Sequence, residues 1–560
     1  MNRLVRLAII VLFVLSCTTS IVFQTMALPL TTKIDELFSE WNRPDSPGFA
    51  LAIIKDSETV YKRGYGIADL EHNIPISSSS VFDIASTSKQ FTAMCIALLA
   101  RQGKLSLDDE IQKYISEMPR YEYPITVRHL IHHTSGIRDY LTLMELAGMR
   151  SENNYPDDEI IGLIARQKEL NFKPGDEQLY SNSGYFLLAE IVKRVSEKSL
   201  AAFANENIFS PLGMNATHFH DDFTMIVKDR AIGYSPKDEG GFRIDMSIFD
   251  VVGDGGVYTT VEDLSLWDRN FYQNRLGGYG QDLIEEVIKP GKLNSGEALE
   301  YAFGLGTGLY RGLEIVSHGG AWMGYRSEML RFPKQRFSVL CLSNLGSANP
   351  EELARKVADL YLASEFTEQI KEPAHSKAQL VEIPSTELES KTGFYQNLKT
   401  GSIWELSVKD GKLTREAFGE NFTLAPLSSN HFIAVDIPFD IDIEFEKPGS
   451  DEPFHLSVRI EGGKPDVYQR LNIVSFNSDQ LKEFAGEYHC EELDVTYKII
   501  VEDGKLLLNR RNSPQETLKP ISKDLLKGTY TTFQFIRDDH NQVTGFNLGA
   551  GRVKSIRFAK

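Results

Sequence analysis

Ser86 and Lys89 are the residues of this chain whose types and spacing best suit chemistry. From Ser86 onward, apolar residues recur at helical spacing, and Gly103 supplies the left-handed stop that helix ends favour. Positions three apart lie on one face of a helix, so the hydroxyl and the amine come within hydrogen-bonding reach. A lysine in a cleft can take the serine proton, and free N–H groups at the helix start favour developing negative charge. The pair predicts a nucleophilic serine opening a buried helix; by itself it also fits a capping serine followed by a solvated lysine.

A serine nucleophile also needs a proton donor for the leaving group. Tyr180 and Asn182 stand at the start of a helix predicted over residues 182–195, so a phenol and an amide project from one helix start. A tyrosinate beside Lys89 is a second candidate base for Ser86, and Asn182 is expected to hydrogen-bond Lys89 and a substrate carbonyl. Taken alone, Tyr180 also fits an ordinary packed tyrosine.

A third group of residues, His318, Gly319 and Gly320, is predicted to end the strand 313–317. Two glycines at a strand end let a backbone approach a ligand closely. The N–H of Ala321, paired with that of the nucleophile, is expected to form the oxyanion hole, with the glycines lining the substrate site. His318 is expected beside the lysine or facing the substrate; a histidine satisfied by a backbone carbonyl is the alternative.

The elements that must position these residues are strands at both ends of a mostly helical segment. Residues 48–55 and 58–68 read as a hairpin, and Thr260 reads as the cap of a helix. Strands at both ends predict one antiparallel sheet and an α+β domain over residues 28–365. Four further strands, at 304–310, 313–317, 326–332 and 337–343, precede a helix at 350–362.

The last third of the chain is a repeat. After a Pro-containing charged linker at 366–385, residues 386–473 and 474–560 are strand-rich and share residues in register. Turn signals every 8 to 12 residues predict two small antiparallel β-barrels or sandwiches. The matching residues are Leu388, Gly393, Tyr395, Asp410, Gly411, Lys412 and Leu413, which recur 93 positions later as Leu481, Gly486, Tyr488, Asp503, Gly504, Lys505 and Leu506.

The net charge limits the possible binding partners, and the N-terminal sequence indicates the cellular compartment. A net charge of -18 argues against nucleic-acid or anionic-membrane partners. Two arginines followed by an apolar run predict that residues 1–27 are a signal peptide, with Leu28 the mature start; Cys17 as a bacterial lipid-attachment site is the alternative. The chain is therefore expected to be exported, in a bacterial periplasm or secreted. The remaining cysteines, Cys95, Cys341 and Cys490, are expected to be buried thiols.

The three motifs occur in order as Ser86-Thr87-Ser88-Lys89, Tyr180-Ser181-Asn182 and His318-Gly319-Gly320. With them the chain resembles the serine β-lactamase and penicillin-binding superfamily, in its class C-like group of serine peptidases and esterases. The resemblance implies a β-lactamase-like fold and an acyl-enzyme on Ser86, with Lys89, Tyr180, Asn182 and His318 in the site and no metal or organic cofactor. The segment around His132 and His133 is structural in this family, and adjacent histidines without a third ligand do not favour zinc.

The third motif narrows the set of activities that the family resemblance allows. Lactamases and carboxypeptidases of this superfamily usually carry a threonine where this chain has Gly319, and that hydroxyl helps to receive a substrate carboxylate. The His-Gly-Gly motif and the two barrel-like repeats resemble those of the D-aminopeptidases and esterases of this superfamily. Related hydrolases carry similar lipocalin-like C-terminal tails. We therefore expect an aminopeptidase of D-amino-acid type, or an esterase, acting on small-molecule or peptide substrates. The alternatives are a class C-like β-lactamase, a D-alanyl-D-alanine carboxypeptidase, or a catalytically degenerate binding module.

Overall fold

The computed structural model describes residues 28–150, 152–368, 380–399, 401–417, 420–435, 441–446, 454–460, 464–472, 474 and 476–560. The predicted signal peptide with Cys17, and residues 369–379 of the predicted linker, lie outside these residues. Within the described part, no helix combines the length and apolar character needed to cross a bilayer.

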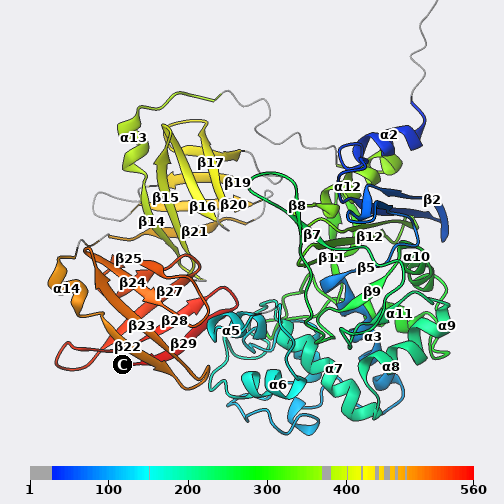
Figure 1. The fold of residues 1–560 in the computed structure, drawn as a ribbon, viewed down its shortest axis with the longest axis horizontal. Helices are drawn as coiled ribbons and strands as arrows, with labels where there is room; N and C mark the ends of the chain where they lie inside the picture. Colours follow the sequence, from blue (N-terminus) through cyan, green and yellow to red (C-terminus); the bar gives the residue numbers. More distant parts are fainter. Residues whose placement is uncertain are drawn as a thin grey trace, which may run out of the picture.

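A six-stranded antiparallel sheet forms the centre of the first part of the chain (Figure 1). The first strand pairs with the last along its whole length, from Phe49 opposite Ser343 to Lys55 opposite Phe337, so the prediction that terminal strands meet in one sheet is confirmed. The strand order is β10 (Gly306–Tyr310), β11 (Leu313–Trp322), β12 (Tyr325–Phe332), β13 (Phe337–Ser343), β1 (Phe49–Lys55) and β2 (Glu58–Tyr65).

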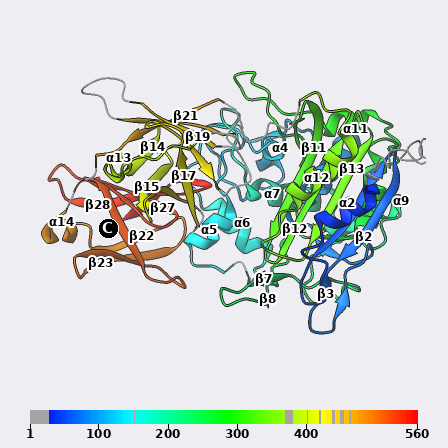
Figure 2. The same ribbon diagram turned by 90° about the horizontal axis from the view of Figure 1, so that it is seen from above.

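Helices cover both faces of this sheet (Figure 2). One face of β1, with Phe49, Leu51 and Ile53, packs with α2 (Leu30–Leu37) and α12 (Pro350–Leu362). The opposite face joins the larger helical core. Both faces of β1 are apolar because both are buried, which is why its sequence lacks alternation.

Helix α3 (Lys89–Arg101) runs through the centre of the helical layer. Its first eleven residues, from Lys89 to Leu99, are buried, as expected for a helix apolar all round. It packs against α7 (Asn182–Ser196). The other helices of this layer are α4 (Val127–Ile131), α5 (Tyr140–Leu146), α6 (Asp157–Ala165), α8 (Leu200–Ala204), α9 (Ser210–Leu212), α10 (Val261–Asn270) and α11 (Asp282–Val287), with the short turns η1 (Ala85–Ser88), η2 (Ile111–Lys113) and η3 (Asn205–Phe209).

Short strands complete this part of the chain. They form three small sheets. They are β3 (Ile67–Asp69) with β4 (Ile74–Pro75), β5 (Phe82–Asp83) with β9 (Val257–Thr259) and β6 (His218–Phe219), and β7 (Tyr234–Pro236) with β8 (Phe242–Ile244).

Three local predictions differ from the structure. The predicted strand 58–68 is broken at Gly66, whose φ of +77° turns the chain into the separate strand β3. Ser86 lies in the 3₁₀ turn η1 just before α3, not in the helix itself. The strand predicted to end at residue 317 continues through His318, Gly319 and Gly320 as β11, because these residues pair with β12.

The two C-terminal repeats are closed eight-stranded antiparallel barrels, as the repeat predicted. Each begins with a short helix, α13 (Ser385–Ser390) or α14 (Ser478–Lys482). The first barrel is β14 (Gly393–Asn397), β15 (Ile403–Lys409), β16 (Lys412–Ala417), β17 (Glu420–Pro426), β18 (His431–Val435), β19 (Ile441–Glu446), β20 (His455–Ile460) and β21 (Asp466–Arg470). The second is β22 (Gly486–Cys490), β23 (Val495–Glu502), β24 (Lys505–Asn509), β25 (Glu516–Ser522), β26 (Leu525–Lys527), β27 (Thr531–Arg537), β28 (Val543–Ala550) and β29 (Val553–Ala559).

The second barrel docks on the helical layer, whereas the interior of the first forms its own core. The Tyr497 hydroxyl donates to the carbonyl of Leu146 at 2.8 Å, at the end of α5. The two barrels meet through Glu405, which accepts from Lys519 and Lys527. Figure 1 shows the second barrel, in orange and red, lying against α5. The three cysteines in the described part, Cys95, Cys341 and Cys490, are free and buried, as predicted.

Candidate active site

Ser86 sits in a tight turn held from both sides. The preceding residue, Ala85, has a φ of +46°, a conformation that non-glycine residues rarely adopt, and its N–H donates to Asp83 Oδ1 at 2.7 Å. Ser327 of β12 donates to the Ile84 carbonyl at 2.8 Å, which ties the turn to the sheet. The sequence thus places its serine on a constrained turn between a strand and a buried helix.

The amine of Lys89 donates hydrogen bonds to three acceptors. Its Nζ lies 3.1 Å from Ser86 Oγ, 2.9 Å from Asn182 Oδ1 and 2.5 Å from the carbonyl oxygen of Asp254. The side chain is fully buried, so its direction is fixed. The expected contacts of Lys89 with Ser86 and Asn182 are both present, so the amine is placed to exchange a proton with the serine hydroxyl.

Tyr180 faces the same amine with its ring. Lys89 Nζ lies 4.9 Å from the ring centroid, and the guanidinium of Arg552 lies 4.8 Å from it. The Tyr180 hydroxyl is buried and has no hydrogen-bond partner in the described structure. Of the two candidate bases, Lys89 is the one that contacts Ser86, and the phenol is free for another group.

The edge of the sheet forms the opposite wall. His318 Nε2 lies 2.9 Å from the Tyr301 hydroxyl, and His318 Nδ1 lies 2.6 Å from the Gly319 carbonyl. Burial, with the nearby charge of Lys89, lowers the pKa of His318 to about 4, so the ring is neutral at neutral pH. A Cβ on Gly320 would lie 2.2 Å from the Ile84 carbonyl oxygen, so only glycine lets this strand approach the serine turn.

These residues line one cavity of about 570 Å³. Polar groups converge there with aromatic walls such as Phe249 and Trp322, as is usual for a small-molecule site. Ser86, Tyr180, Asn182, His318, Gly319, Gly320 and Ala321 all line it, while Lys89 lies behind them.

The second barrel reaches this cavity. Arg552, in the turn between β28 and β29, lines it and lies 3.6 Å from Asp139 Oδ2. Asp139, in turn, accepts from the backbone N–H of Asn182 at 2.7 Å. The barrel is held in place beside this contact by a buried ion pair, Arg138 Nη1 to Glu492 Oε2, at 2.7 Å. A segment some 370 residues beyond Asn182 in the chain therefore completes the site.

His132 and His133 support the site without entering it. Burial lowers the pKa of both, that of His132 to about 4, so both rings are neutral. His133 Nδ1 accepts from the N–H of Ser181 at 3.2 Å and its ring packs on Tyr180, whereas His132 Nδ1 lies 3.2 Å from the Tyr301 carbonyl. The two side chains thus have different partners.

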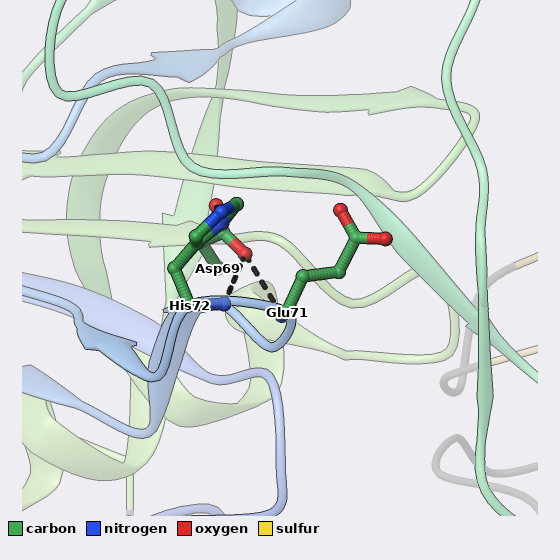
Figure 3. A group of neighbouring side chains, drawn as sticks. All are labelled: Asp69, Glu71 and His72. Carbon is green, nitrogen blue, oxygen red and sulfur yellow. Dashed lines mark hydrogen bonds and ion pairs between the residues drawn. The ribbon is translucent and has the colours of Figure 1, made fainter.

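Side chains of the types that bind metal ions lie close together elsewhere, on the surface turn after β3. In the part of the chain that the structure describes, Asp69, Glu71 and His72 are the group close enough to share an ion (Figure 3). Asp69 already accepts from the backbone N–H groups of Glu71 and His72 and from the His72 ring. These hydrogen bonds within the turn account for the cluster without an ion.

Sequence reasoning missed several residues of this site. Asp139 lies six residues after His133, so the segment around His132 and His133 carried a signal for it, and Asp254 stands between two glycines, Gly253 and Gly255, in a predicted loop region. Tyr301, which fixes His318, and Arg552, which comes from the second barrel, had no local signal.

Comparison with known proteins agrees with this geometry. The chain is 30% identical to a D-aminopeptidase of Cereibacter sphaeroides, covering 92% of this chain and 96% of the relative. It is 28% identical to a D-aminopeptidase of Gluconobacter oxydans, covering 80% of each chain. A penicillin-binding protein of Bacillus subtilis is 28% identical, covering 69% of this chain and 88% of the relative.

Solved structures show the same fold. The octameric penicillin-binding protein homologue from Pyrococcus abyssi superposes with a TM-score of 0.55 at 24% identity, covering 79% of this chain and 99% of that one. The D-amino acid amidase from Ochrobactrum anthropi SV3, complexed with L-phenylalanine amide, gives 0.51 at 24% identity, covering 60% and 99%. The beta-lactamase family profile matches residues 34–364, which hold the whole serine-lysine-tyrosine cluster. The chain is a serine hydrolase that belongs to the beta-lactamase family.

Proposed function

We propose that this protein is an aminopeptidase that releases D-amino acids from peptides or small amides through an acyl-enzyme on Ser86. The observation that carries the acyl-enzyme step is the contact of Lys89 Nζ with Ser86 Oγ at 3.1 Å beside the cavity. The D-amino-acid preference is supported by the two similar D-aminopeptidases, whose lengths this chain covers by 80% and 96%.

In this mechanism Ser86 Oγ attacks the substrate carbonyl carbon while Lys89, in its uncharged amine form, takes the hydroxyl proton. The N–H groups of Ser86 and Ala321 receive the oxyanion. Tyr180, whose hydroxyl has no hydrogen-bond partner among the described residues, passes its proton to the leaving amine and regains one from the Lys89 ammonium. Water then attacks the acyl carbon and gives a proton to the uncharged Lys89 amine. Lys89 returns that proton to Ser86 Oγ as the bond between the acyl carbon and Oγ breaks, which releases the amino acid. Asn182 keeps Lys89 directed at the serine and contacts the substrate carbonyl.

Arg552 favours a second candidate, a D-alanyl-D-alanine carboxypeptidase. Its guanidinium lines the cavity and is suited to receive a substrate carboxylate. Against this candidate, the guanidinium already faces Asp139, and Gly319 supplies no hydroxyl at the third motif. An esterase uses the same steps with an alcohol as leaving group.

Intact mass after fluorophosphonate treatment tests the nucleophile. We expect one adduct on the wild type and none on Ser86→Ala; an adduct on both variants would exclude Ser86. A panel of D- and L-amino-acid p-nitroanilides, p-nitrophenyl esters, an N-acylated D-alanyl-D-alanine peptide and nitrocefin then separates the activities. Fastest turnover of D-anilides supports the aminopeptidase, and release of D-alanine from the blocked peptide supports the carboxypeptidase.

We further propose that the protein is exported after cleavage before Leu28. Two arginines ahead of an apolar run support this. Mass analysis of the protein from a bacterial host distinguishes a chain that begins at Leu28 from one that carries a lipid on Cys17.

A further inference from the structure

Asp254 lines the active-site cavity, and one of its carboxylate oxygens has no hydrogen-bond partner among the described residues. The residue lies in the loop before β9, is 8% exposed and lines the cavity. Its Oδ2 accepts from the Tyr140 hydroxyl at 3.1 Å, but its Oδ1 is buried and has no hydrogen-bond partner in the described structure. A buried carboxylate oxygen left without a donor is costly, so a donor from outside the protein is the natural complement.

The position of Asp254 fits the amino group of an aminoacyl substrate. In such a substrate the α-nitrogen lies about 2.5 Å from the carbonyl carbon, because one tetrahedral carbon separates them. Ser86 attacks that carbon, and the same Lys89 Nζ contacts both Ser86 Oγ and the Asp254 backbone oxygen. Asp254 and the nucleophile therefore contact the same lysine, and both residues line the cavity that would receive the acyl residue of the substrate.

Other carboxyl groups at the cavity are less suited to this role. Asp83 Oδ1 accepts from the Ala85 N–H and holds the serine turn. Glu328 lies on β12, opposite Gly319 of β11, and burial raises its pKa to about 8, so it is neutral at neutral pH. Burial also raises the pKa of Asp254, but only to about 6, because Lys89 opposes the shift, so Asp254 is mostly ionised at pH 7.

We infer that Asp254 binds the α-ammonium group of the substrate and so restricts efficient turnover to substrates with a free amino terminus. This inference rests on the proposed aminopeptidase function. It assigns to one residue the discrimination between amino-terminal residues and blocked or amine-free acyl groups.

The test compares D-alanine p-nitroanilide with propionic acid p-nitroanilide, which lacks only the amine. We expect Asp254→Asn to lower the ratio of the two kcat/KM values at least 30-fold, and Asp254→Glu to retain part of the preference. Glu351→Gln is the matched control, because Glu351 is an exposed carboxylate at the same cavity and pairs with Arg355. Its ratio is expected to equal that of the wild type.

Fluorophosphonate titration counts the folded sites in each variant. An unchanged ratio in Asp254→Asn with full titration would overturn the inference and leave the proposed function intact. Wild-type protein that titrates but cleaves no D-aminoacyl anilide would overturn both.

A wild-type pH profile tests the inference even if Asp254→Asn does not fold. The same ratio should rise as the pH increases through about 6 and fall when the substrate amine loses its proton near 8. Dividing the two rates cancels groups that serve both substrates. The groups that bear on the Asp254 carboxyl are Lys89, Asp83 and Asp139 by charge and the Tyr140 hydroxyl by its hydrogen bond. A ratio independent of pH between 5 and 7 would refute the assignment.

Discussion

Glu328→Gln tests whether a buried carboxyl group beneath the substrate strand lowers the stability of the fold. Glu328 is 3% exposed on β12, and its Oε2 would lie 3.0 Å from a Cβ on Gly319. Burial raises its pKa from the ordinary 4.5 to about 8; Glu351 adds to the rise and Arg355 opposes it. Glutamine keeps the shape of the side chain and removes the charge.

The sign of the pH dependence follows from the difference in proton binding between the folded and the unfolded protein. Between pH 4.5 and 8 the folded protein holds a proton on Glu328 that the unfolded chain has lost, so the free energy of unfolding falls as the pH rises through this range. Below pH 4.5 the side chain is protonated in both states and the effect vanishes. A pKa of about 8 instead of 4.5 corresponds to at most about 5 kcal/mol. Relaxation of the protein around a charged carboxylate lowers this value, and we expect about 2–4 kcal/mol at pH 8.

The assay is urea unfolding of wild type and Glu328→Gln at pH 4.5, 6 and 8, followed by tryptophan fluorescence. Three of the four tryptophans, Trp41, Trp267 and Trp322, lie in the hydrolase part of the chain, so the signal reports chiefly its unfolding. We expect equal stability at pH 4.5 and a growing advantage of the variant as the pH rises. A constant difference at all three values would refute the reasoning. Glu314→Gln is the control, because Glu314 is an exposed carboxylate on β11 that pairs with Lys334 and does not contribute to the Glu328 shift.

Three further substitutions probe the site and its support. Tyr180→Phe should lower kcat for anilides about 10²–10⁴-fold with little change in KM, because only the proton donor is lost; steady-state kinetics with unchanged kcat would contradict this role. Arg138→Ala leaves Glu492 buried without its cation and should cost about 3–5 kcal/mol in urea unfolding, largely relieved by adding Glu492→Gln. Gly320→Ala should slow fluorophosphonate labelling of Ser86, since its Cβ meets the Ile84 carbonyl; unchanged labelling rates would argue against this close approach.

Much of the fold could be predicted because its signals are local. The helix Pro350–Leu362 and the strand Phe337–Ser343 have the predicted bounds, since a proline start and an apolar run act over a few residues. The barrels were predictable from the repeat, because two copies with one pattern of turns must fold alike.

Errors arose where a partner strand or a backbone conformation decided the outcome. The glycines after His318 looked like the end of a strand, yet pairing with β12 carries β11 to Trp322. Gly66 looked like part of a strand, yet its positive φ ends β2. Pairing across the sheet and a left-handed residue both depend on neighbours remote in the chain.

The sequence by itself determined the chemistry: a serine three residues before a lysine, a tyrosine and an amide at a helix start, and a glycine-rich strand, in the order of one family. Only the tertiary structure decided which of these groups touch. It directs Lys89 at Ser86 and brings Arg552 from the second barrel to the cavity. Among the residues that the structure describes, it leaves the Tyr180 hydroxyl and Asp254 Oδ1 without hydrogen-bond partners. The physical reason is that short-range patterns fix residue types and local conformation, whereas contacts between distant segments depend on how the whole chain packs.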